Sequence, residues 1–129
     1  MKVERVVCAV DCGFAVSPDG VRAQMESGIL YGLTAALYGN IEIRDGAVVQ
    51  GNFHDYKAVR MDEAPRIETH IIDSHEPWGG AGEPGTPGIA PALTAAVFQA
   101  TGVRVRDLPL SKHRLDAPIE EQGEATRHG

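Results

Sequence analysis

The spacing of apolar residues divides the chain into segments with different expected structures. Residues 3–10 are rich in the β-branched residue valine, and their apolar run is almost uninterrupted. This pattern is typical of a strand buried on both faces at the centre of a sheet. After a turn-forming stretch, Ser17 and Pro18 supply the N-cap and the first residue of a helix that Gly39 ends. The apolar residues of this helix are spaced four apart, as a single buried face requires: Val21, Met25, Ile29, Leu33 and Leu37.

Two glycines interrupt the predicted helix. Gly28 and Gly32 lie about one turn apart and therefore on nearly one face. Two missing side chains at this spacing predict that another backbone, or a ligand, approaches the helix closely.

A hairpin and a further strand are expected after the helix. Asp45 and Gly46 stand between the apolar runs 41–44 and 47–50, and both residue types tolerate positive φ, so the pair predicts a tight hairpin turn. A polar, irregular stretch separates this hairpin from residues 66–73, which return to a strand pattern.

A second helix is expected to begin at Ile89 and to end at Gly102, with Pro91 in its first turn. Its predicted buried face consists of Ile89, Leu93, Val97 and Ala100. Residues 103–110 predict a short edge strand, and the charged residues 111–129 predict a disordered tail.

The order of these elements predicts the fold class. Strand, helix, hairpin, strand, glycine-rich loop and helix imply a two-layer α+β domain, in which two helices cover one face of a mixed sheet. This domain is expected to span residues 1–110, because no linker or repeat divides them.

Composition narrows the functional classes. The 129 residues carry 12 Lys and Arg against 18 Asp and Glu, a net charge of −6, which argues against binding to a nucleic-acid backbone. The sequence has no run of twenty apolar residues and no apolar leader, so we expect no membrane insertion and a cytoplasmic location. Cys8 and Cys12 fit neither a redox pair nor a four-ligand zinc site, and we expect both to be reduced packing residues.

Polar residues that could carry chemistry are few. Residues 77–88 are dense in glycine and proline and hold one carboxylate, Glu83, which is a candidate general base because the backbone around it can approach a ligand. The alternatives are a solvated loop glutamate and a loop that holds an anion through backbone N–H groups. The Gln24 amide offers a donor and an acceptor to a polar ligand, or lies on a bare helix surface.

A metal site is not expected. The histidines at positions 70 and 75 are five apart at a strand end, which places them on opposite faces of the strand, away from a shared ion beside Asp73.

Two segments together resemble the C-terminal part of the molybdenum-binding large subunit in the xanthine oxidase and aldehyde oxidase family. Residues 9–26, from Ala-Val-Asp-Cys-Gly to Gln-Met-Glu, are similar to the segment in which that family presents a cofactor-contacting glutamine, and Gln24 takes that position. Residues 79–87, Gly-Gly-Ala-Gly-Glu-Pro-Gly-Thr-Pro, are similar to the signature that holds the catalytic glutamate, and Glu83 takes its place. The resemblance covers nearly all of residues 3–110 and is greatest to the isoquinoline 1-oxidoreductase type, in its beta subunit.

The resemblance implies a molybdopterin enzyme that hydroxylates an N-heterocycle or an aldehyde with water as the oxygen source. Glu83 would then be the general base, while Gln24, Gly80, Ala81 and Gly82 would contact the cofactor. Electrons would leave through iron–sulfur clusters of a partner subunit. Because the family's large subunits are several times longer, a larger molybdenum-binding subunit would complete the site, and the cofactor would bind only in that complex.

The alternative hypothesis is a non-catalytic remnant or folding module. Such a chain would cover its exposed cofactor face by self-association into a homodimer.

The cellular location has an alternative as well. Instead of staying in the cytoplasm, the chain could be carried to the periplasm by a partner.

Overall fold

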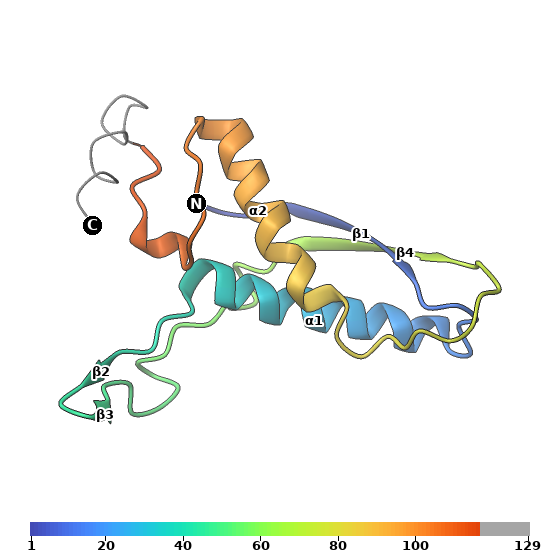
Figure 1. The fold of residues 1–129 in the computed structure, drawn as a ribbon, viewed down its shortest axis with the longest axis horizontal. Coiled ribbons are helices and arrows are strands. Elements are labelled where there is room, and N and C mark those ends of the chain that lie inside the picture. The colour runs from blue at the N-terminus through green and yellow to red at the C-terminus, as the bar shows by residue number, and fades with distance from the viewer. Residues whose placement is uncertain (117–129) are drawn as a thin grey trace.

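A parallel pair of strands joined through a helix forms the first half of the fold. The computed structural model describes residues 1–116 (Figure 1). Strand β1 (Arg5–Asp11) leads to helix α1 (Pro18–Tyr38), and strand β4 (Arg66–Ile72) then runs parallel to β1. The pairing starts at Arg5 opposite Arg66 and ends at Asp11 opposite Ile72, and the pair lies along α1.

A hairpin and a second helix complete the architecture. Strands β2 (Ile43–Arg44) and β3 (Ala47–Val48) pair antiparallel and stand away from the body of the molecule. Helix α2 (Gly85–Thr101) crosses α1, and a 3₁₀ turn η1 (Leu110–Lys112) follows. The expected α+β class is confirmed, with the parallel and antiparallel strands divided between two small sheets. No helix within residues 1–116 has the length and apolarity to cross a membrane.

Helix α1 has the predicted ends. The Gly20 N–H donates to the Ser17 hydroxyl at 3.4 Å, and Pro18 occupies the first helical position. At the other end the Gly39 N–H donates to the carbonyl oxygens of Thr34 and Ala35, both at 3.1 Å. The hairpin turn is confirmed as well, because Asp45 and Gly46 have φ of 51° and 78°.

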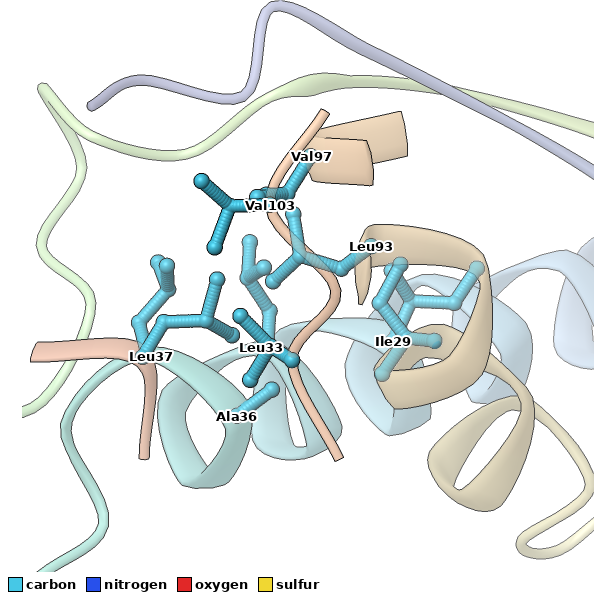
Figure 2. Close-up of a cluster of buried hydrophobic side chains, with 10 residues drawn as sticks. Ile29, Leu33, Ala36, Leu37, Leu93, Val97 and Val103 are labelled. Carbon is cyan, nitrogen blue, oxygen red and sulfur yellow. The ribbon is translucent and has the colours of Figure 1, made fainter. Parts of the chain in front are cut away.

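The core lies where the two helices cross (Figure 2). Leu33 of α1 is fully buried at its centre. Side chains from α1, α2 and the segment after α2 surround it: Ile29, Ala36, Leu37, Ile89, Leu93, Val97, Val103, Val105 and Leu110. The sheet contributes partly buried residues, among them Val6, Cys8 and Ile67.

The helix glycines mark the closest approach of α2 to α1, as the sequence predicts. A Cβ added at Gly28 would lie 3.1 Å from the Thr86 hydroxyl and 3.3 Å from the Thr86 nitrogen. A Cβ at Gly32 would collide with the Thr86 carbonyl and the Ile89 side chain. The approaching backbone is therefore the first turn of α2.

The expectation that β1 is buried on both faces is wrong for this structure. Burial alternates along β1, with Val10 buried, Val6 and Cys8 half-buried, and Val7 and Ala9 exposed. Since β4 is its single strand neighbour within residues 1–116, β1 lies at an edge and not at the centre of a sheet.

The predicted start of the second helix is also wrong. α2 begins at Gly85 and not at Ile89, so Pro91 lies beyond the first turn and leaves the Pro87 carbonyl without its helical donor. Gly102 ends the helix in a left-handed conformation, as predicted, with φ of 75°. Ala100, expected on the buried face, is exposed.

Residues 103–110 form no strand. Val103 and Val105 are buried against the core, but the segment has no strand partner in the described part of the chain. Residues 111–116, assigned to the tail by sequence, begin inside η1, and Leu115 packs against the core. The remainder of the predicted tail, residues 117–129, lies outside the described residues.

Candidate cofactor-binding and catalytic site

Two loops at the carboxyl ends of β1 and β4 are held side by side by hydrogen bonds. The Ser74 hydroxyl donates to the Asp11 carboxylate at 2.7 Å, and the Gly13 N–H donates to the same oxygen at 3.0 Å. These two bonds, the Ser74 bond above all, lower the pKa of the Asp11 carboxyl. The Gly79 N–H donates to the Cys12 carbonyl at 3.2 Å, so the glycine-rich loop is tied to the end of β1.

Gly13 sets how closely these loops approach. Its φ is 73°, and a Cβ added there would lie 2.8 Å from the Pro77 carbonyl oxygen. Both the backbone conformation and the contact therefore require glycine at this turn.

A hollow of about 380 Å³ lies between these loops and the start of α1. Three of the sequence-predicted site residues, Gln24, Gly80 and Ala81, line it together. The remaining lining residues are mostly apolar: Cys12, Phe14, Ala15, Val16, Ser17, Gly20, Val21 and Trp78. Gln24 is exposed, so its amide is accessible to a ligand.

The glycines of this loop leave room around their backbone. A Cβ added at Gly79, Gly80 or Gly82 would meet nothing within 4 Å, and Gly80 has φ of 79°. A ligand can therefore approach this backbone more closely than side chains would allow.

Neither Glu83 nor Gly82 is among the residues that line the hollow. The Glu83 side chain is exposed, and the Glu83 carbonyl accepts a bond from the Thr86 N–H at 3.0 Å in the turn that starts α2. Two residues further on, a Cβ at Gly85 would lie 2.9 Å from the Met25 carbonyl. Met25 follows Gln24 in α1, and Gly85 is the first residue of α2. This contact therefore packs the start of α2, which follows Glu83, against the part of α1 that carries Gln24.

The other titratable residues singled out by sequence form no comparable site. Within residues 1–116, no group of three or more His, Cys, Asp or Glu is placed to hold a metal ion. The His75 imidazole lies 3.5 Å from the Asp73 carboxylate, and both side chains are largely exposed. Cys8 and Cys12 are free thiols; Cys12 is buried and Cys8 packs against the core.

A second hollow, of about 650 Å³, lies at the other end of α1. The Tyr38 hydroxyl there donates to the Glu63 carboxylate at 2.6 Å, and the Lys57 ammonium lies 3.8 Å from the centre of the Tyr38 ring. The hydrogen bond from Tyr38 lowers the pKa of Glu63 and raises that of Tyr38. None of the predicted site residues lines this hollow.

Sequence reasoning missed the residues that shape the first hollow. Asp11 carried a usable signal, because an aspartate two residues before a glycine at a strand end is typical of an Asx turn. Ser74 carried none, since its partner is 63 positions away. The walls formed by Phe14, Val16 and Trp78 follow from the loop pairing, which the sequence pattern does not contain.

Comparisons with known proteins show the family to which the chain belongs. Residues 1–65 match the family model described as molybdopterin cofactor-binding domain. The chain is 39% identical over 110 residues to the beta subunit of isoquinoline 1-oxidoreductase from Brevundimonas diminuta, covering 85% of this chain and 14% of that protein. It is 31% identical over 123 residues to a nicotinate dehydrogenase subunit of Pseudomonas putida, covering 95% of this chain and 10% of that one.

A solved structure shares the fold. Quinoline 2-oxidoreductase from Pseudomonas putida 86 superposes with a TM-score of 0.76 at 23% identity, over 84% of this chain and 15% of that one. The chain thus spans between 10% and 15% of the length of these relatives. The match over half of its residues shows that the chain belongs to the molybdopterin cofactor-binding domain family of molybdenum-binding oxidoreductase subunits.

Proposed function

We propose that this chain is the C-terminal part of a molybdenum hydroxylase subunit and supplies two residues to its active site. Gln24 contacts the molybdopterin cofactor, together with the backbone of Gly80, Ala81 and Gly82, and Glu83 acts as the general base. The reaction hydroxylates an N-heterocycle or an aldehyde with water as the oxygen source.

One observation carries the proposal. The packing of Gly85 against the Met25 carbonyl joins the helix that carries Gln24 to the loop that carries Glu83. The same loop lines a hollow with Gln24 through Gly80 and Ala81. Gln24 therefore lines one open space with Gly80 and Ala81, and Glu83 belongs to the same loop as these two residues.

The residues present suit a molybdopterin group. The exposed Gln24 amide offers two donors and an acceptor to a polar ring edge, and the open backbone at Gly79, Gly80 and Gly82 permits close approach. When bound, the group supplies a redox-active, Lewis-acidic metal centre. The Glu83 carboxylate is exposed and can accept a proton, which is the role of a general base.

A larger polypeptide completes the site. The chain spans 14% of the relative from Brevundimonas diminuta, so the proposed partner corresponds to the other six sevenths of such a protein. A further subunit with iron–sulfur clusters would remove the electrons, since two cysteines cannot hold such a cluster.

Molybdenum content tests the proposal. The probe is the isoquinoline 1-oxidoreductase chain of Brevundimonas diminuta from which the segment that aligns with this chain has been deleted, below called the truncated relative. We expect molybdenum in its complex with this chain and none in the chain alone. Gln24→Ala should weaken retention about three- to tenfold through lost hydrogen bonds, whereas Gln99→Ala, at an exposed glutamine of α2, should not. Metal in the isolated chain, or equal retention by both variants, would contradict the proposal.

Self-association is a second candidate function. Phe14, Val16 and Trp78 are 55%, 78% and 76% exposed around the hollow, which favours burial of this surface against another molecule. Sedimentation velocity of the isolated chain distinguishes the two: a stable dimer that the truncated relative cannot dissociate would favour self-association, and a monomer that forms a heterodimer would favour the enzyme.

A further inference from the structure

Strand β1 has the sequence of a central strand but the position of an edge strand. Its residues Val6, Val7, Cys8, Ala9 and Val10 form an unbroken apolar run, which is typical of parallel strands covered on both faces and paired on both sides. In the structure it pairs with β4 alone among the described residues, and Val7 is 55% exposed. Parallel strands normally occur in larger sheets that are covered on both faces, because two isolated strands are only marginally stable.

The hydrogen-bond pattern identifies the free edge of β1. The Arg66 N–H donates to the Glu4 carbonyl at 3.1 Å, so even-numbered residues of β1 turn their backbone groups towards β4. Backbone groups alternate along a strand, and the N–H and C=O of Val7 and Ala9 therefore point to the open edge. An additional strand would bond at these two residues.

Strand β4 is less suited to gain a neighbour. Its outward-facing side chains include Arg66, Glu68 and His70, and Glu68 accepts bonds from Arg5 at 2.9 and 2.8 Å on that same face. Charged side chains on an edge strand oppose further pairing. The charged outward residues of β1, Arg5 and Asp11, lie at its two ends, and the outward residues between them, Val7 and Ala9, are apolar.

We propose that a strand of the larger molybdenum-binding polypeptide pairs with the free edge of β1. This inference rests on the proposed function for the existence of that polypeptide. The length of the relatives indicates where the pairing strand comes from. In the relatives compared above this fold makes up between 10% and 15% of one chain, so most of their polypeptide is available to cover the surfaces that are open here. Strand addition satisfies the backbone groups of Val7 and Ala9 and makes β1 the central strand that its sequence describes.

Amide hydrogen exchange tests the pairing directly. The full chain is mixed with the truncated relative, and exchange is followed at single residues. We expect exchange at Val7 and Ala9 to slow about tenfold or more in the complex, while Thr69 and Ile71, whose N–H groups face the free edge of β4, are unchanged. Slowing at the β4 edge, slowing at neither edge, or no complex would overturn the proposal.

A pair of variants at one position gives the control. Ala9→Pro removes the N–H that points to the free edge of β1 and is not bonded to β4, so it should weaken binding to the truncated relative about tenfold. Ala9→Val keeps this N–H and should bind normally. Continued protection at Val6 and Cys8 would show that the proline variant remains folded. Equal binding by both variants refutes the β1 pairing. A complex with protected β1 amides but no dependence of molybdenum retention on Gln24 refutes the proposed function and leaves the pairing intact.

Discussion

Gly32→Ala is expected to force α1 and α2 apart and to destabilise the fold. The added methyl group would overlap the Thr86 carbonyl oxygen and the Ile89 side chain. A carbonyl in a helix cannot rotate away, so the helices must separate, which would also loosen the nearby packing of Gly85 against the Met25 carbonyl. The same substitution should therefore reduce both stability and activity in the complex.

The magnitude follows from two opposing effects. Overpacking a close helix contact costs about 1–3 kcal/mol. The methyl group added at Gly32 would overlap both a backbone carbonyl and a side chain, so we expect a cost near the upper end of this range. Alanine improves helix propensity by about 1 kcal/mol. The expected net loss is about 2 kcal/mol, or roughly 8 °C in Tm for a chain of this length.

Urea unfolding followed by circular dichroism measures this difference. Gly88→Ala is the matched control, because Gly88 also lies in a helix but a Cβ there meets nothing within 4 Å. It should gain up to ~1 kcal/mol. If Gly32→Ala proved as stable as Gly88→Ala, the close approach of the two helices would be refuted.

Two further predictions concern hydrogen-bonded carboxylates. The folded Asp11 carboxyl has a pKa below its ordinary value of 3.8, so the stability that it contributes is present above pH 3.8 and is lost as the pH falls through the folded pKa. Ser74→Ala removes the main donor and should therefore reduce this loss of stability at low pH, which urea unfolding between pH 5 and pH 2 measures. An unchanged pH profile would show that the hydrogen bond between Ser74 and Asp11 does not form. Tyr38→Phe should raise the pKa of Glu63 towards its ordinary value, measurable by NMR titration, and no change would show that the 2.6 Å bond does not form in solution.

The sequence predicted those elements whose determinants are local. Ser17, Pro18 and Gly39 fix the ends of α1, and Asp45-Gly46 fixes the hairpin turn. The start of α2 escaped prediction because glycine and proline at 85–88 are typical of a loop. Packing of Gly85 against the Met25 carbonyl compensates for this poor local preference.

Long-range pairing limited the other predictions. The apolar residues of β1 indicate burial on both faces, but one strand partner within residues 1–116 leaves an edge and a face open. Val103 and Val105 alternate as in a strand, and they are buried by the helices instead of pairing in a sheet. Glu83 could be selected by its place in the glycine-rich loop and Gln24 by its amide, but their roles come only from the resemblance of their segments, since neither residue type indicates a site by itself.

Turnover by the Glu83→Gln variant tests the central claim most directly. The chain is combined with the truncated relative, and oxidation of isoquinoline is followed with a dye as electron acceptor. Glu83→Gln should lower kcat about 100- to 10,000-fold, the usual contribution of a general base, at unchanged molybdenum content. Glu76→Gln, at an exposed glutamate of the same loop, should retain full turnover. Full turnover by Glu83→Gln would contradict the account.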